Sequence, residues 1–538
     1  MLSAPASTHD AVVVGSGPNG LVAANLLADA GWDVVVLEAQ PEPGGAVRSA
    51  GYLGPGFVAD VCSAFYPLAV ASPAIASLGL EDHGLRWAHA PAVLAHPLPD
   101  GGCALLTRDV AETSSALERL GRGDGAAWER LWELWGRIGP ALLEALFTPF
   151  PPVRAGARLL ARAGPAGTPR LARFAALPVR RLAEEEFSGP AALLLAGCTM
   201  HTDLTPESAG GALYGWILSM LGHQYGWPVP EGGAGRLAQA MVGRLHSRGG
   251  EVRCSTPAEE VLVRNGRATG VRAASGETFG ARRAVIADVA APLLYGGLVG
   301  WEHLPARLRD DMRRFQWDYA TVKVDWALSG RVPWSAEAAG RAGTVHLSGG
   351  IDEMTMYCAQ LATGVVPDVP FVLMGQMTTA DPSRSPEGTQ SLWGYTHVPR
   401  SVKGDAAGRG LSGRWDGTEL EMMADRVEQQ VERFAPGFRA LVSRRHVLGP
   451  RQLQEHNANA VGGAVNGGTA AAHQQLFLRP VPGLGRPRTP VEGLYLASSS
   501  AHPGGGVHGA CGANAARAAL RAQSPVRRWL SGGPVTLA

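Results

Sequence analysis

The stretch from Asp10 to Ala39, DAVVVGSGPNGLVAANLLADAGWDVVVLEA, decides the fold class of this chain. Residues 11–14 are apolar and mostly β-branched, as expected for a strand that is buried on both faces. A glycine-rich turn follows, then an alanine-rich helix over residues 21–30 and a second apolar strand over residues 34–37. The stretch therefore predicts a complete β-α-β unit.

The turn has the G-x-G-x-x-G spacing of a dinucleotide-binding loop. Gly15 permits the tight turn, Gly17 lets the backbone approach a pyrophosphate, and Gly20 lets helix and strand pack closely. The N-terminus of the helix adds free N–H groups and the positive end of its dipole, both of which favour phosphate. The predicted phosphate-binding loop comprises Gly15, Ser16, Gly17, Pro18, Asn19 and Gly20.

The residues after the second strand indicate which dinucleotide binds. Glu38 and Ala39 end that strand, and the Glu38 carboxylate is placed to accept hydrogen bonds from a ribose while repelling the 2′-phosphate of NADP. A Gly44–Gly45 doublet and Arg48 follow. This pattern resembles the second fingerprint of glutathione-reductase-like and amine-oxidase-like FAD enzymes, which implies that Gly45 approaches the cofactor and Arg48 lies beside its phosphates or flavin.

The C-terminal part of the chain predicts a second cofactor contact. Residues 493–500 are a strand that ends in small polar side chains, and a glycine-rich loop leads into a small-residue helix beginning at His508. We expect Gly505, Gly506 and Val507 to approach the flavin and the helix to direct its positive end at the flavin O2/N1 edge. Such a dipole contributes only about 0.3–1 kcal/mol, so it assists flavin reduction without explaining it.

With these motifs the chain resembles the phytoene dehydrogenase-related branch of FAD-dependent oxidoreductases. That branch includes desaturases, isomerases and members of unknown substrate. The resemblance implies that the adenine lies near the Ala258 backbone and the ribityl chain near Ser498 and Ser499, where related enzymes often carry Gly-Asp or Gly-Glu. It is carried by residues 14–20, 44–48, 381–388 (DPSRSPEG), 462–464, 479–480 and 488–509.

The predicted fold class is α/β, with a Rossmann-like FAD-binding domain and a substrate domain of mixed sheet and helices. We expect the FAD-binding domain to be assembled from residues 1–75, 230–300 and 485–538. The substrate domain then comprises a helical cap at residues 76–229 and a second part at residues 301–484. An apolar stripe at helical spacing supports the cap, and it consists of Trp128, Leu131, Trp132, Trp135 and Ile138.

Composition excludes several classes of protein. The formal net charge of +1 argues against a dedicated nucleic-acid binder. The six cysteines are scattered without a C-x-x-C pair, which favours a reducing cytosol and argues against a metal site or a disulfide framework. No secretory signal and no apolar run long enough to span a bilayer is visible. We therefore expect a cytoplasmic enzyme, either soluble or attached peripherally to a membrane.

Residues 145–183 are the candidate membrane contact. Between Glu144 and Glu184 the chain has no acidic residue, and arginines alternate with leucines, phenylalanines and prolines. Such a basic amphipathic segment can lie on an anionic membrane surface. The alternative is an arginine-rich helical cap that its prolines divide into short pieces. The arginines are Arg154, Arg158, Arg162, Arg170, Arg173, Arg180 and Arg181.

The catalytic candidates are His502, in the flavin-facing loop, and His508, because either could hold or move a proton. Each could equally be a structural residue. The leading hypothesis is dehydrogenation or desaturation of an apolar substrate, isoprenoid or polyene, by hydride transfer to flavin N5, with an unknown electron acceptor. The alternatives are an oxygen-using oxidase of amines or small metabolites, a redox-neutral flavin isomerase, and a flavoprotein that acts through protein partners.

Overall fold

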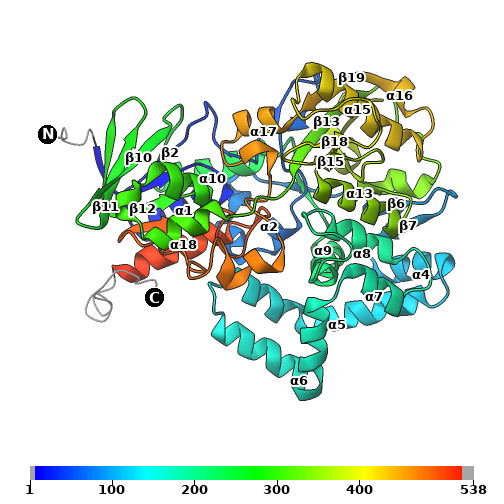
Figure 1. Cartoon of the computed structure of the whole chain (residues 1–538), viewed down its shortest axis with the longest axis horizontal. Coiled ribbons are helices and arrows are strands. Elements are labelled where there is room, and N and C mark those ends of the chain that lie inside the picture. Colours follow the sequence, from blue (N-terminus) through cyan, green and yellow to red (C-terminus); the bar gives the residue numbers. More distant parts are fainter. Residues whose placement is uncertain (1–6, 524–538) are drawn as a thin grey trace.

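The computed structural model describes residues 7–523, and its two large sheets lie at opposite ends of the molecule (Figure 1). Sheet 1 has seven strands, and a second seven-stranded sheet, sheet 2, is formed mainly by the second half of the chain. A group of helices, α4 to α9, extends below sheet 2. The predicted α/β fold class is thereby confirmed. The predicted domain boundaries remain predictions, and residues 1–6 and 524–538 lie outside the described part of the chain.

Sheet 1 joins three segments that are far apart in the sequence. Its order is β10-β11-β12-β1-β2-β9, with β20 paired to β12. The pairs β1–β2, β1–β12, β2–β9 and β12–β20 are parallel, so the carboxyl ends of these strands meet at one edge. The strands are β1 Ser7–Val14, β2 Val34–Leu37, β9 Glu251–Arg253, β10 Ala258–Arg264, β11 Arg267–Ala273, β12 Thr278–Ala287 and β20 Leu494–Leu496.

Three helices cover sheet 1 and its carboxyl edge, namely α1 Pro18–Asp29, α10 Gly235–Ser247 and α18 Ala510–Ala522. Helix α1 follows the predicted β-α turn directly, and Leu27 packs with Val13 of β1 and Ala516 of α18 in one buried cluster. Two close backbone contacts require glycine. A Cβ on Gly20 would lie 2.1 Å from the carbonyl oxygen of Gly15, and one on Gly512 would lie 1.8 Å from the carbonyl oxygen of Asn19.

Sheet 2 has the order β19-β13-β17-β16-β14-β6-β7 and is buried on both faces. Alternate residues of β16 show this, because Leu373 packs with the cap helices while Val372 and Met374 pack with the helix α15. The strands are β6 Ala92–Pro97, β7 Cys103–Leu106, β13 Ala320–Leu328, β14 Ala342–Leu347, β16 Val372–Gln376, β17 Gln390–Val398 and β19 Val442–Leu448, flanked by helices α13 Ile351–Thr363 and α15 Gly417–Glu432.

The helical cap contains the predicted apolar stripe. Trp128, Trp135 and Ile138 of α5 are buried, whereas Trp132 is only partly buried. Helix α6 is interrupted at Gly164, which has φ +70° and directly precedes Pro165, so the segment consists of two shorter helices joined at a kink. Within residues 7–523 we find no helix that is both long and apolar enough to cross a bilayer. The cap helices are α4 Val110–Leu120, α5 Asp124–Phe147, α6 Val153–Ala176, α7 Val179–Glu186, α8 Ala192–Thr199 and α9 Gly211–Tyr225.

Short elements complete the fold. Two-stranded ladders pair β3 with β4, β5 with β8 and β15 with β18. These strands are β3 Ser49–Ala50, β4 Ala59–Asp60, β5 Trp87–Ala88, β8 Val229–Pro230, β15 Val365–Val366 and β18 Gly404–Asp405, and the short helices are α2 Pro67–Ala71, α3 Pro73–Ala76, α11 Ala291–Leu293, α12 Ala306–Arg313, α14 Met377–Ala380, α16 Phe438–Leu441 and α17 Pro450–His456.

A fully buried ion-pair network joins the parts of the chain that carry the two sheets. The guanidinium of Arg384 donates to Asp60 Oδ2 at 2.9 Å, to Asp381 Oδ2 at 3.0 Å and to the carbonyl oxygen of Pro230 at 3.2 Å. Asp60 also accepts the N–H of Ala234, just before α10. Arg384 and Asp60 are inaccessible to solvent. The network therefore fixes residues 381–384 against both the first segment of the chain and the entry to α10.

We predict that Arg384→Met lowers the free energy of unfolding by about 3–5 kcal/mol, because it leaves the carboxylates of Asp60 and Asp381 buried without a counter-ion. Urea denaturation followed by tryptophan fluorescence measures the change. Arg313→Met is the matched control, since the side chain of Arg313 is 78% exposed and its ion pair with Asp310 is on the surface. Equal midpoints for both variants would show that the network does not hold the fold together.

Candidate functional site

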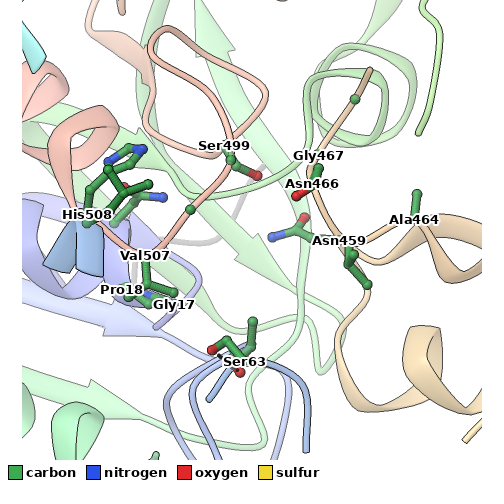
Figure 2. Close-up of a pocket in the computed structure, with 18 of the residues that line it drawn as sticks. Gly17, Pro18, Ser63, Asn459, Ala464, Asn466, Gly467, Ser499, Val507 and His508 are labelled. Atoms are coloured by element: carbon green, nitrogen blue, oxygen red, sulfur yellow. Dashed lines mark hydrogen bonds between the residues drawn. The ribbon is translucent and has the colours of Figure 1, made fainter. Parts of the chain in front are cut away.

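A cavity of about 1130 Å³ lies at the carboxyl edge of sheet 1 and reaches sheet 2. Figure 2 shows some of the residues that line it. Loops after β1, β2, β12 and β20 form one end, and strands β13, β16 and β17 with helices α5 and α9 contribute to the other. Most of the residues predicted from the sequence meet here. The predicted residues that line the cavity are Gly15, Gly17, Pro18, Asn19, Glu38, Ala39, Gly45, Ala258, Ser499, His502, Gly505, Gly506, Val507 and His508.

The phosphate-binding loop and the glycine doublet touch each other. Gly45 has φ +57°, and a Cβ on it would lie 3.1 Å from the Cα of Gly17. The N–H of Gly44 donates to the carbonyl oxygen of Ser16 at 3.1 Å. The two motifs therefore form one surface of bare backbone at the N-terminus of α1, a cradle that a side chain at Gly45 would obstruct. This surface fits a dinucleotide pyrophosphate.

Glu38 is held in a fixed orientation. Its Oε2 accepts the N–H of Ser16 at 2.9 Å and the Ser16 hydroxyl, and its Oε1 accepts the N–H of Gln40 at 2.8 Å. Ser16 itself does not line the cavity, so its role is to position Glu38. Gly20 also lies outside the lining, where it permits the close packing described above. The carboxylate is thus presented at the place where a Rossmann-type site binds a ribose.

Asp288 is a site residue that the sequence did not single out. It follows β12, it is 6% exposed, and its Oδ2 accepts the N–H of Gly20 at 2.9 Å. A Cβ on Gly17 would lie 2.5 Å from the same oxygen. Burial, with the nearby Glu38 carboxylate as a further cause, raises the pKa of Asp288 to about 7. This acid therefore serves as the side-chain cap of α1 from a strand far away in the sequence.

Two predicted contacts, Arg48 and Ser498, lie behind the cavity wall. The guanidinium of Arg48 donates to the carbonyl oxygen of His456, and its Nε has no hydrogen-bond partner within residues 7–523. The Ser498 hydroxyl accepts the N–H of Ser500 at 3.3 Å. Ser499 does line the cavity, and its carbonyl oxygen accepts two hydrogen bonds from Arg479. The expected phosphate or flavin contact of Arg48 and the ribityl contact of Ser498 stay predictions.

Two buried side chains of opposite charge hold the loop at residues 464–469 through hydrogen bonds to its backbone. The carboxylate of Asp318 accepts the N–H groups of Val465, Asn466 and Gly468 at 2.8–3.1 Å. The guanidinium of Arg479 donates to the carbonyl oxygens of four loop residues and of Ser499, and both charged groups are buried. Burial raises the pKa of Asp318 and lowers that of Arg479. The loop presents Asn466, whose Nδ2 has no partner among the described residues, at the cavity wall (Figure 2).

The two candidate histidines differ in the hydrogen-bond partners of their ring nitrogens. His508 lies before α18; its Nδ1 accepts the N–H of Ala510, and its Nε2 contacts the carbonyl oxygen of Gly504. Burial lowers the pKa of His508 to about 4. Both nitrogens are therefore occupied by the backbone. This neutral, helix-capping arrangement argues against the predicted proton-transfer role for His508.

His502 keeps one nitrogen free. Its Nε2 lies 3.0 Å from the carbonyl oxygen of Thr148, to which it must donate, and its Nδ1 has no partner among residues 7–523. The side chain is 5% exposed and lines the cavity, and burial lowers its pKa. Nδ1 therefore carries a lone pair that can accept a proton, so the catalytic prediction for His502 stands as a prediction with a suitable geometry.

The end of the cavity away from the dinucleotide loops is apolar and aromatic. Trp393 and Tyr395 on β17 stack with ring centroids 5.9 Å apart. Lys323 on β13 also lines the cavity, where its ammonium group is buried against the carboxylate of Asp325. Glu38 and Asp288, both at the dinucleotide end, are the carboxylates among the described lining residues. Apolar residues at the other end include Phe65, Leu68, Leu142, Leu146, Leu213, Ile217, Leu218 and Leu373.

Sequence reasoning missed several of these residues. Lys323 is one of only two lysines in the chain, and with Asp325 it forms a charged pair inside an otherwise apolar strand. That pattern was a usable signal, because charges in a buried strand need partners. Asp318 carries no such signal, since its partners are backbone groups of a distant loop. Arg479 lies in the 479–480 motif that carries the resemblance, but its hydrogen bonds to the loop carbonyl groups are visible only in the structure.

The comparisons with known proteins agree with this geometry. Residues 13–78 match the NAD(P)-binding Rossmann-like domain family. The chain is 29% identical to pyridine nucleotide-disulfide oxidoreductase domain-containing protein 2 of Mus musculus over 95% of this chain and 93% of that one. It is 25% identical to a neurosporene-forming phytoene desaturase of Cereibacter sphaeroides over 97% of each, and 23% identical to the prolycopene isomerase of Daucus carota over 93% and 77%.

Solved structures share the fold. An oxidoreductase from Methanosarcina mazei matches with a TM-score of 0.61 and 16% identity over 95% of this chain and 99% of that one. Cyclohexylamine oxidase from Brevibacterium oxydans matches with a TM-score of 0.56 and 18% identity over the same shares. The predicted resemblance is thereby confirmed: the chain is similar in sequence to a phytoene desaturase over most of its length, and it shares the fold of an amine oxidase.

We predict that Asp288→Asn changes the pH dependence of stability. The folded-state pKa of Asp288 lies above its unfolded value, so its stabilising contribution is complete below about pH 4 and is lost as the pH rises through about 7. The wild type should therefore lose up to about 4 kcal/mol relative to the variant over that range, at about 1.4 kcal/mol per pKa unit.

Urea titrations at several pH values between these limits measure the difference. Asp310→Asn is the matched control, because Asp310 is 61% exposed. If the stability difference between wild type and Asp288→Asn is the same at every pH, then Asp288 is ionised throughout and the prediction is wrong.

Proposed function

We propose that this chain is an FAD-dependent oxidoreductase that dehydrogenates or desaturates an apolar substrate, with isoprenoids and polyenes as the candidate class. The observation that carries the proposal is the division of the cavity. Its dinucleotide end is bare backbone with the oriented carboxylate of Glu38 and the buried acid Asp288, and its other end is apolar and aromatic without a carboxylate among the described lining residues. A neutral apolar molecule suits that end better than a charged one.

The residues present fit FAD. Gly17 and Gly45 form the cradle for the pyrophosphate, Glu38 is placed for a ribose, and the 505–507 loop precedes α18. Bound there, FAD would supply the hydride acceptor at its N5. The lining residues would place the substrate carbon beside it and exclude water, and such positioning is the protein's main contribution when the cofactor carries the difficult step.

His502 is the residue best placed to take the proton that dehydrogenation releases. Its Nε2 is held by Thr148 at the end of α5, which fixes the ring and leaves the Nδ1 lone pair free. Because burial keeps the imidazole neutral, this nitrogen is ready to accept a proton at neutral pH.

An amine oxidase that uses oxygen is the second candidate. The stacked Trp393–Tyr395 pair favours it, because aromatic faces attract a substrate cation. A carboxylate to receive an ammonium group is missing from that end among the described residues. Rapid aerobic reoxidation with release of peroxide would favour this candidate over the desaturase.

Two further outcomes would indicate the remaining alternatives. Turnover without a net electron acceptor would indicate an isomerase. A flavin that no donor reduces would indicate a protein that acts through partners.

The absorption spectrum of the purified protein tests the cofactor. We expect flavin bands at about 370 and 450 nm and release of FAD on denaturation. Gly45→Val should purify without colour, because its side chain would fill the cradle against Gly17. Gly243→Val is the control, since a Cβ on Gly243 meets nothing within 4 Å. A colourless wild type that cannot be reconstituted with FAD would remove the proposal.

Anaerobic reduction of the flavin by candidate polyenes and amines then tests the substrate class. We predict that His502→Gln slows reduction by an apolar donor by about 10²-fold or more, because the proton acceptor is lost. His473→Gln, at an exposed histidine bonded to Gln316, should leave the rate unchanged. An unchanged rate in His502→Gln would mean that His502 is structural and that hydride transfer needs no protein base.

A further inference from the structure

The apolar end of the cavity contains two polar groups that have no partner. Thr344 of β14 lines the cavity and is 1% exposed, and its hydroxyl forms no hydrogen bond within residues 7–523. His201, in the loop between α8 and α9, lines the same end, and its Nδ1 likewise lacks a partner in the described part of the chain. A buried polar atom without a hydrogen bond costs free energy, so each such atom requires an explanation.

A second histidine holds the ring of His201 in place. His346 lies two residues after Thr344 on β14 and is inaccessible to solvent, so the two side chains share one face of sheet 2. Nε2 of His346 lies 2.8 Å from Nε2 of His201. The ring of Trp227 packs edge-on against that of His201, with centroids 5.4 Å apart. His201 is thus fixed between sheet 2 and the cavity wall, with Nδ1 as its unbonded nitrogen.

The surroundings of His346 decide where its hydrogen lies. Nδ1 of this ring is enclosed by protein and has no partner among the described residues. A Cβ on Gly197 of α8 would lie 2.0 Å from it, so a Cα hydrogen of Gly197 points toward this nitrogen. A lone pair tolerates such a C–H group, whereas an N–H would collide with it and lack an acceptor. The hydrogen of His346 therefore lies on Nε2.

The hydrogen of His201 is fixed in turn. Burial lowers the pKa of His346 well below its ordinary value and, with His397 nearby as a further cause, lowers the pKa of His201 to about 3. Both rings are therefore neutral, and a neutral imidazole carries one N–H and one lone pair. Because His346 donates from Nε2, Nε2 of His201 accepts and its Nδ1 carries the hydrogen. The apolar end of the cavity thus contains an N–H donor without an acceptor.

We propose that the His201 Nδ1–H and the Thr344 hydroxyl bind an oxygen-containing group of the substrate, which is thus an apolar molecule that bears a carbonyl or hydroxyl group. This inference rests on the proposed function. The substrate oxygen accepts the N–H of His201, and the Thr344 hydroxyl can either donate or accept. The hydrocarbon part of the molecule then lies along the aliphatic and aromatic side chains of the same end.

Such a contact determines specificity and position. A pure hydrocarbon leaves both groups unpaired, whereas a molecule with an oxygen satisfies them, and this difference discriminates strongly between substrates of similar size. The contact also fixes which end of a long molecule lies at His201, and therefore which carbon reaches the dinucleotide end. His201 and Thr344 act here as positioning residues that take no part in the chemical step.

Ligand binding to the purified holoprotein tests this assignment. The probes are farnesal and the hydrocarbon that has a methyl group in place of its aldehyde, and Trp227 and Trp393 in the cavity wall report binding through their fluorescence. The aldehyde is the decisive probe, because it accepts a hydrogen bond and cannot donate one. We expect His201→Phe to raise the Kd of farnesal about tenfold, as for the loss of one hydrogen bond, and to leave the Kd of the hydrocarbon unchanged.

Two further variants separate a binding role from a structural one. His201→Asn retains an amide donor close to the position of Nδ1 and should restore the binding of farnesal. Thr344→Val removes the hydroxyl with little change of volume and should weaken the binding of farnesal in the same selective way. The matched controls are His473→Phe and Thr363→Val, because both residues are exposed and lie outside the cavity lining.

The ratio of the two Kd values decides the outcome. Equal changes for farnesal and the hydrocarbon in His201→Phe would overturn the proposal, since the ring would then only fill space. If His201→Phe does not fold, Thr344→Val decides alone, and an unchanged ratio in that variant would overturn the proposal.

Reduction of the flavin separates this proposal from the proposed function. Selective binding of farnesal by a protein whose flavin no apolar donor reduces would support the oxygen-binding site and overturn the proposed function. Reduction by hydrocarbon polyenes, together with a Kd ratio that neither variant changes, would overturn the oxygen-binding site alone.

Discussion

The buried guanidinium of Arg384 is the interaction on which the arrangement of the two sheets depends. It pairs with Asp60 from the first segment of the chain and with its neighbour Asp381, and it reaches the carbonyl oxygen of Pro230 before α10. A charge that has lost its water must find all of its partners within the protein. The network therefore ties residues 381–384 to the first segment of the chain and to the residues before α10, and so joins the parts of the chain that carry sheet 1 and sheet 2.

The same principle recurs within the cavity wall. Asp318 and Arg479 bind the N–H and carbonyl groups of one loop from opposite sides, and Asp288 caps α1 from the end of β12. In each case the buried side chain forms its hydrogen bonds with backbone groups and not with a side chain of opposite charge. These groups hold the site in place, and the lining residues that keep hydrogen-bonding capacity toward a cofactor or substrate include Glu38, His502 and Asn466.

The cavity has two chemically different ends, and this difference connects the fold to the function. The carboxyl edge of a parallel sheet offers helix N-termini and bare backbone, which suit phosphates. The inner face of sheet 2 and the cap helices offer aromatic and aliphatic side chains, which suit an apolar molecule.

Residues close together in the chain were sufficient to predict the local structure at the dinucleotide end. The glycines at 15, 17 and 20 with Glu38 predicted the β-α-β unit and an acid at the end of its second strand, because turn chemistry and strand periodicity act over a few residues. The sequence likewise predicted His502 as a catalytic candidate and residues 505–507 as a loop that approaches the cofactor. Only the tertiary structure decided that Asp288 caps α1, that Arg48 faces His456, that Lys323 lines the cavity, and that Phe477 meets Phe150. The pairwise contacts among these join residues 268 to 408 positions apart along the chain, and local periodicity carries no information about which distant strands and loops will pair.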